Sequence, residues 1–250
     1  CFYAYLDAIS LLDKISERFP DLRTLHIDNV NPMNVVTEKG RKITSAIVKN
    51  CTSGNVAAFG VESFDPNVIN ANNLNCDAES VYEAVKVINE FGKEVGENGL
   101  QKFLPGLNLL FGLDKESKKT HEENMKWLNK IINDGLLLRR INVRQVNIFE
   151  GTALYNSVGN KYLKKNKKYY WKWRNDIRQN IDFPMLKRLV PVGNVLKDVR
   201  MEVHDGNHTF GRQMGSYPLI VGINKKVELG RSLDVKVIGH MLRSVVGEIV

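Results

Sequence analysis

The sequence predicts an α/β fold in which a partial (β/α) TIM-type barrel with parallel strands is followed by a small all-β barrel. Over the first 150 residues, segments with the period of a strand alternate with segments with the period of an amphipathic helix. Such alternation is typical of parallel sheets built from right-handed βαβ units. From residue 197 onward the helical period is lost, and short alternating runs are separated by glycine or asparagine. Runs of this kind indicate a small barrel.

The first part of the chain is expected to hold four strands. A helix is expected over residues 6–19, where apolar side chains recur at helical spacing and Pro20 ends the run. The first strand follows at residues 22–28. Further helices are expected at 42–49, 80–91 and 120–133, and further strands at 55–61, 102–111 and 139–148. Four strands are too few to close an eight-stranded barrel, so we expect a partial one.

A basic and aromatic stretch links the two parts. Residues 161–178 hold eight lysines and arginines against one acid, Asp176, with tyrosines and tryptophans among them. The stretch is either a nucleic-acid-binding surface or a connector helix whose aromatic side chains pack on the small barrel. We place the boundary between the domains near residues 185–197, which gives an α/β domain over 1–190 and a β-barrel domain over 191–250. Strands of the second domain are expected at 199–204, 217–223, 233–238 and 244–250.

Composition narrows the class of protein. The chain has 250 residues, of which 43% are hydrophobic and 26% charged, as in globular proteins with a sizeable core. No apolar run approaches the roughly 18 residues that a membrane-spanning helix needs. The net charge of +8 indicates either a polyanionic partner or simply a basic, solvated surface. The three cysteines are widely spaced, which argues against a disulfide framework and for a reducing, cytoplasmic location.

Polar side chains stand in the last part of each of the four expected strands or directly after it. Asn29 and Asn31 come after the first strand, Glu62 after the second, Asn108 stands in the third, and Asn147 stands near the end of the fourth. Functional residues of open α/β sheets gather at the carboxyl ends of the strands. The pattern therefore predicts a polar ligand above the sheet; the alternative is that these residues only begin solvated loops.

At these strand ends the chain resembles the radical S-adenosylmethionine (SAM) superfamily, and within it methylthiotransferase-like and archaeal-type members. Gly60-Val61-Glu62-Ser63 resembles a strand segment of such enzymes, as do the segments at 106–113 and 143–152. The resemblance covers about residues 1 to 155. The chain departs from the pattern in the turn at 114–117 and at Asn29 and Asn31, which replace a frequent Gly-Gly-Glu.

The resemblance implies a [4Fe–4S] cluster and SAM as cofactors, with an electron donor such as ferredoxin or flavodoxin. The superfamily binds its cluster through C-x-x-x-C-x-x-C, of which Cys1 is expected to be the last cysteine, with the rest of the motif upstream. On this interpretation Cys51 and Cys76 are structural thiols. The resemblance implies that the residues that bind SAM are Glu62, Asn29, Asn31, Asn108, Arg144 and Asn147, with backbone groups around Asn147 near the adenine.

The C-terminal segments at 210–218, 229–237 and 246–249 resemble the TRAM type of OB-like domain. That domain occurs at the C-terminus of tRNA-modifying radical SAM enzymes and binds RNA. The resemblance implies an RNA surface on a small barrel whose basic residues follow a phosphate backbone. The residues expected to bind RNA are Arg212, Lys225, Lys226, Arg231 and Lys236.

The leading hypothesis is a radical SAM enzyme that modifies RNA, with tRNA as the expected substrate, by methylthiolation or a related radical reaction. With an incomplete cluster motif, this chain alone would be inactive. The alternative is a non-catalytic nucleic-acid-binding protein on a degenerate barrel. A third class, enzymes of phosphorylated small molecules, is disfavoured because the sequence has no glycine-rich phosphate loop. No residue is assigned as catalytic.

Overall fold

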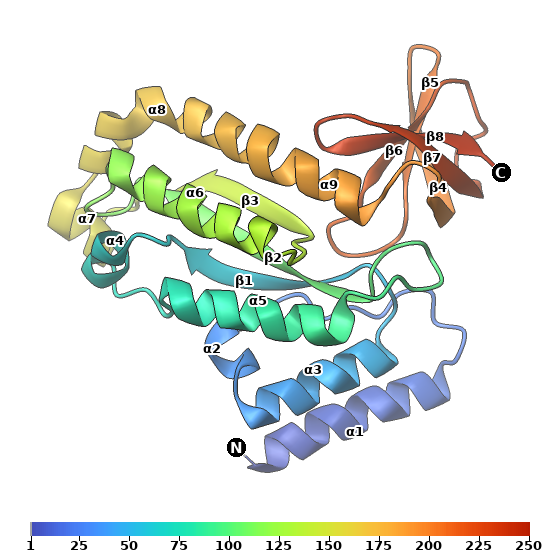
Figure 1. Cartoon of the computed structure of the whole chain (residues 1–250), viewed down its shortest axis with the longest axis horizontal. Helices are drawn as coiled ribbons and strands as arrows, with labels where there is room; N and C mark the ends of the chain where they lie inside the picture. The colour runs from blue at the N-terminus through green and yellow to red at the C-terminus, as the bar shows by residue number, and fades with distance from the viewer. Residues whose placement is uncertain (1) are drawn as a thin grey trace.

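A computed structural model describes residues 2–250, with side chains from Asp7 onward, and shows an α/β part followed by a small barrel (Figure 1). The chain begins with α1 (Phe2–Arg18), α2 (Pro32–Val35) and α3 (Glu38–Asn50). Helix α1 packs on α3, and α2 contacts both α3 and α5. Pro32 in the first turn of α2 and the Thr37 side chain before α3 fix where these helices start.

A parallel sheet forms the centre of the α/β part. Within residues 2–250 its strands are ordered β1-β2-β3, with β1 paired to β2 and β2 to β3. Helices α5 and α6 cross one face of the sheet (Figure 1), and α5 packs directly on β2. The bounds are β1 (Asn55–Glu62), α4 (Pro66–Ala71), α5 (Ala78–Gly92), β2 (Phe103–Phe111), α6 (Lys118–Asn133) and β3 (Arg140–Gln145).

The strand expected at residues 22–28 is not a regular strand. The described chain makes one parallel bridge here, between Asn29 and Ala58. Upstream of the bridge, backbone N–H groups donate to side chains instead of to a strand. Leu25 N–H donates to Thr52 Oγ1 (2.9 Å) and Ile27 N–H to Asn55 Oδ1 (3.1 Å). Because these donors are taken by side chains, no ladder to β1 forms. The expectation of a fourth sheet strand was therefore wrong.

The basic and aromatic stretch forms a helix. It is α8 (Lys161–Ile177), preceded by α7 (Ala153–Val158) and followed by a π-helical turn, η1 (Arg178–Asp182), and α9 (Phe183–Leu189). Helix α8 buries Tyr162, Tyr170 and Trp173 and packs on β3. The rings of Tyr170 and Trp173 contact Phe111 of β2 at centroid distances of 5.9 and 5.6 Å. These aromatic side chains pack on the parallel sheet, not on the small barrel.

The C-terminal part is a closed barrel. In the part of the chain that the structure describes, its strand order is β4-β5-β6-β8-β7, antiparallel except for the parallel pair β6 and β8. Strand β5 was not expected as a separate strand, although the turn at Gly206, with φ +58°, reverses the chain directly into it. The bounds are β4 (Val195–Asp205), β5 (His208–Arg212), β6 (Ile220–Ile223), β7 (Ser232–His240) and β8 (Ser244–Ile249).

The barrel is docked on the α/β part, with which it shares one continuous hydrophobic core. Gln213 Nε2 donates to Asn98 O (2.6 Å) and Lys197 O (2.8 Å), and His26 Nδ1 accepts from Ser216 N–H (3.1 Å). Among residues 2–250, none of the helices combines the length and the apolar character needed to cross a bilayer.

Candidate functional site

One face of the sheet carries a row of small and polar residues. Side chains alternate along β2, so Leu107 and Leu109 enter the core, whereas Asn108 between them is partly exposed on the opposite face. The register places Gly60 of β1 beside Asn108, and Asn108 beside Asn142 of β3. The row crosses all three strands toward their carboxyl ends.

Glu62 lies at the end of β1 in an unusual backbone conformation. The register of β1 shifts between Gly60 and Glu62, and Glu62 has φ +61°. Such backbone is uncommon for a residue other than glycine and is concentrated at functional sites. A Cβ built on Gly60 would lie 3.5 Å from Glu62 Oε1, so the carboxylate sits beside the space that Gly60 leaves open. Burial raises the pKa of Glu62, while the charge of Arg144 opposes that rise.

Arg144 completes the group from β3. It lies two residues after Asn142, on the same face of the strand. With the Asn142 amide oxygen turned toward Arg144, that oxygen accepts from Nε at 2.7 Å and Nη2 at 2.9 Å. The amides of Asn142 and Asn108 lie 3.2 Å apart. Glu62, Asn108, Asn142 and Arg144 thus offer a carboxylate, two amides and a guanidinium on one open face, a set suited to a small ligand with charged and hydroxyl groups.

Asn142 was missed in the sequence. The signal was present, because Asn142 lies two residues before Arg144 in the same expected strand. The register that sets it beside Asn108 is a property of the folded sheet.

The other expected ligand residues are three asparagines in the loops. Asn31 caps α2, its Oδ1 accepting from Met33 N–H at 3.0 Å. Asn29 is exposed beside the bridge to Ala58, and Asn147 is exposed two residues beyond β3. The structure therefore brings Asn108 and Arg144 to one face with Glu62, whereas the side chain of Asn31 is used as a helix cap.

Buried polar contacts hold the loops next to the site. After β1, Thr120 Oγ1 of α6 donates to Asp65 Oδ2 (2.7 Å), and Phe64 N–H donates to Asn124 Oδ1 (2.8 Å). After β2, Glu116 accepts from Gly112 N–H (2.7 Å) and from Asn166 Nδ2 of α8 (2.9 Å). Burial raises the pKa of Glu116 to about 7. Hence the turn at 114–117, a departure from the radical SAM pattern, holds the end of β2 against α8.

The described thiols do not fit an iron–sulfur cluster. Cys51 lies before β1, whereas Cys76 Sγ lies 3.8 Å from Gly60 O near the other end of that strand. Burial raises the pKa of each thiol to about 11, which disfavours the thiolate that binds iron. In the described ranges no three His, Cys, Asp or Glu side chains are placed to share a metal ion. Cys1, the expected cluster ligand, lies outside the described residues.

The expected RNA-binding residues are spread over the barrel, and some are paired with acids. Arg212 Nε lies 2.7 Å from Glu202 Oε2, and Arg231 Nη1 lies 4.0 Å from Glu228 Oε2. Lys225, Lys226 and Lys236 are exposed.

No known family profile matches the chain. Similar proteins are found among curated sequences and among solved structures. An uncharacterized protein of Methanocaldococcus jannaschii is 45% identical over 249 residues, covering 98% of this chain and 46% of that protein. An uncharacterized protein of Archaeoglobus fulgidus is 42% identical over 228 residues, covering 90% of this chain and 43% of that protein. The chain thus spans about half the length of these relatives.

Two proteins of known structure are similar at lower sequence identity. Coproporphyrinogen III oxidase (HemN) from Escherichia coli has a TM-score of 0.45 and 13% identity, covering 84% of this chain and 51% of that one. The methyltransferase TsrM from Kitasatospora setae, with tryptophan and a SAM analogue bound, has a TM-score of 0.36 and 16% identity, covering 49% and 22%. Both are radical SAM enzymes.

Proposed function

We propose that this chain is the SAM-binding part of a radical SAM enzyme that modifies RNA. The observation that carries the proposal is the half-buried Glu62 carboxylate beside the open position of Gly60, with Asn108, Asn142 and Arg144 on the same face. A half-buried carboxylate needs hydrogen-bond donors on its buried side, and the ribose hydroxyls and amino group of SAM are donors. The sequence resemblance at Gly60-Val61-Glu62-Ser63 selects this ligand among the small molecules that the group could hold.

Each residue of the group would contact a different part of SAM. Glu62 would accept from the ribose or from the methionyl amino group, while Arg144 would bind the methionyl carboxylate in the two-pronged geometry that guanidinium favours. Asn108 and Asn142 would position the ribose. Gly60 leaves the face of the sheet clear, as a close approach of ligand to backbone requires. The [4Fe–4S] cluster would be held outside the described residues, with Cys1 as one ligand, and ferredoxin or flavodoxin would donate electrons.

RNA, with tRNA the expected class, is the proposed substrate, and methylthiolation or a related modification the proposed reaction. Support comes from the TRAM-like sequence of the barrel, the net charge of +8 and the outer face of α8. On that face Lys164, Lys165, Lys167 and Lys168 surround Trp171, which is 65% exposed. Exposed aromatic rings among cations are the platforms on which single-stranded bases stack.

The test is SAM affinity, measured by calorimetry on the complete, anaerobically reconstituted protein. Glu62→Gln should weaken binding at least about tenfold, because a charge-assisted hydrogen bond contributes about 1.5–3 kcal/mol. Gly60→Val should weaken it by filling the space beside Glu62. Glu122→Gln, an exposed change on α6, is the matched control. Unchanged affinity in both site variants would remove this face from the SAM site.

A second candidate is a non-catalytic nucleic-acid-binding protein, favoured by the net charge of +8 and by the exposed Trp171 among the lysines of α8. Iron and sulfide analysis of the complete protein separates the two. About four irons per chain supports the enzyme, since a [4Fe–4S] cluster holds four. A protein that takes up no iron under reconstituting conditions supports the binder.

A further inference from the structure

Four arginines gather where the sheet meets the barrel. Arg139 and Arg140 stand at the start of β3, Arg178 begins η1, and Arg243 lies in the turn between β7 and β8. Arg139, Arg140 and Arg243 line a hollow of about 80 Å³, together with Asp182 and Tyr217. This volume exceeds what one water needs. The barrel lies beside α9 at this end of the molecule (Figure 1).

The hollow holds an excess of positive charge. Across the described chain, none of the four guanidinium groups has a carboxylate oxygen within 4.0 Å in an ion pair, and Asp182 is the acid whose charge acts on Arg140 and Arg178. Asp182 Oδ1 is itself engaged, accepting from Ile141 N–H at 3.1 Å. Three arginines therefore line the hollow with one acid, an arrangement that costs free energy unless an anion joins it.

Hydrogen-bonding capacity is also left over. Arg139 Nη2 donates to Tyr217 O at 3.2 Å, and the Arg140 guanidinium lies 4.4 Å from the Tyr217 ring centroid. The Nε atoms of both arginines are nevertheless buried without a hydrogen-bond partner. Burial, and to a smaller extent the positive charge of Arg140, lowers the pKa of Arg139 to about 10. Buried donors of this kind are normally satisfied, so a missing partner is informative.

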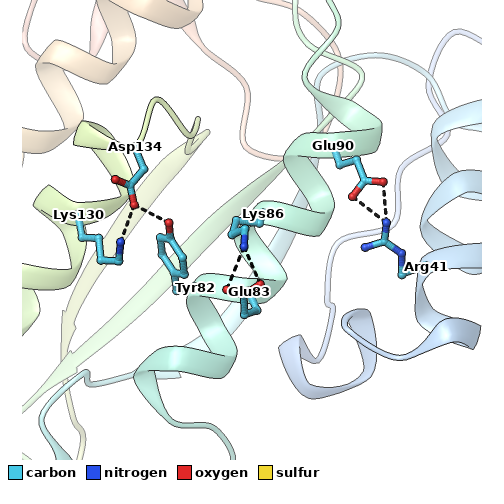
Figure 2. A network of polar contacts seen from close by, with 7 residues as sticks. All are labelled: Arg41, Tyr82, Glu83, Lys86, Glu90, Lys130 and Asp134. Carbon is cyan, nitrogen blue, oxygen red and sulfur yellow. Dashed lines mark hydrogen bonds and ion pairs between the residues drawn. The ribbon is translucent and has the colours of Figure 1, made fainter.

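Several other cations of the protein are paired with acids on the surface. Figure 2 shows Arg41 with Glu90, Lys86 with Glu83, and Lys130 with Asp134, at nitrogen–oxygen distances of 2.6, 3.0 and 2.7 Å. These pairs are on the surface of α3, α5 and α6. The arginines of the hollow differ from these surface pairs, because no acid in the described part of the chain pairs with them and the Nε atoms of Arg139 and Arg140 are buried without a partner.

We propose that the hollow formed by Arg139, Arg140 and Arg243 is a binding site for a phosphate group. Guanidinium groups match phosphate oxygens with two parallel hydrogen bonds, and a phosphate would offset the local charge and give the free Nε groups an acceptor. Arg140 and Arg144 share a face of β3, four residues or about 13 Å apart. If the proposed function holds, the phosphate of an RNA bound here anchors the substrate beside the SAM site.

The experiment uses the full chain and two probes. Thermal unfolding is followed while inorganic phosphate replaces chloride at constant ionic strength, and anisotropy reports binding of a labelled 12-nucleotide single-stranded RNA at several salt concentrations. The variants are Arg243→Gln, an exposed position that should not disturb folding, and Arg140→Gln. Arg41→Gln, on α3 away from the hollow, is the control of equal charge.

Phosphate should raise the Tm of the parent protein and of Arg41→Gln, and Arg243→Gln should lose at least half of that rise. If RNA is the source of the phosphate, Arg243→Gln should weaken RNA binding about fivefold. It should also reduce the slope of log affinity against log salt concentration by about one. Loss of the phosphate response with unchanged RNA binding assigns the site to a phosphorylated small molecule. Equal behaviour of Arg243→Gln and Arg41→Gln with both probes would overturn the proposal. The phosphate experiment does not depend on SAM binding, so its result is independent of the Glu62 experiment.

Discussion

At the scale of single residues, the site depends on groups held in unfavourable settings. Glu62 combines a positive φ with a desolvated carboxylate. Glu116 is 2% exposed, and its carboxylate accepts two hydrogen bonds yet keeps a raised pKa, because burial outweighs both. Strain and desolvation of this kind persist only where the surrounding structure fixes them.

Glu116 should make stability depend on pH. Its folded pKa of about 7 exceeds the ordinary 4.5, so between these values the folded state binds a proton that the unfolded state releases. Stability contributed by this group is present below pH 4.5 and is lost as the pH rises through 7, by up to about 3 kcal/mol. Urea unfolding of the parent protein and of Glu116→Gln at pH 5 and pH 8 measures the loss.

The variant should lack this part of the pH dependence, whereas Glu122→Gln, an exposed change on the neighbouring helix α6, should keep it. A pH dependence in Glu116→Gln as steep as in the parent protein would contradict the assignment to Glu116.

At the scale of elements, α8 has two faces with different roles. Trp173 is 4% exposed and stacks on Tyr169 and His121 at centroid distances of 5.6 and 5.4 Å. Trp171, two residues earlier, is 65% exposed among lysines. The sequence left open whether this stretch packs or binds, and the structure shows both kinds of side chain on one helix.

The two tryptophans of α8 should respond differently to truncation. Trp173→Ala should lower the free energy of unfolding by about 3–5 kcal/mol, as for other large buried side chains. Trp171→Ala should change it by less than about 0.5 kcal/mol and weaken single-stranded RNA binding about fivefold or more through lost stacking. Denaturant unfolding and RNA anisotropy measure the two effects. An equal loss of stability in both variants would refute the two-faced description.

At the scale of the whole molecule, the sheet and barrel behave as one packed body. Gly99 shows how closely they meet: it has φ +85°, and a Cβ there would lie 2.0 Å from Val195 O at the start of β4. Only glycine fits such a contact. Removing the barrel would expose the shared core, so point variants test RNA binding better than deletion of residues 197–250.

Gly99→Ala should therefore destabilise the sheet and the barrel together. Left-handed backbone alone costs an alanine about 1–2 kcal/mol, and the clash with Val195 O adds to it. Calorimetry should show a single transition at a lower Tm. Two separate transitions in the parent protein would contradict the shared core, and an unchanged Tm in the variant would contradict the close contact. Gly135→Ala, where φ is +75° but no atom lies within 4 Å of the added Cβ, separates strain from clash.

The sequence by itself determined the local elements: helices at α3, α5 and α6 and strands at β1, β2 and β3 follow from hydrophobic period, which depends on neighbours in the chain. It also placed Glu62 directly after a strand and Arg144 within one. Only the tertiary structure decided that residues 22–28 form no regular strand, that Asn142 stands beside Asn108, and that Arg139, Arg178 and Arg243 converge. Side-chain competition for backbone donors, strand register and contacts between distant segments set these features, and none of the three is encoded in a local pattern.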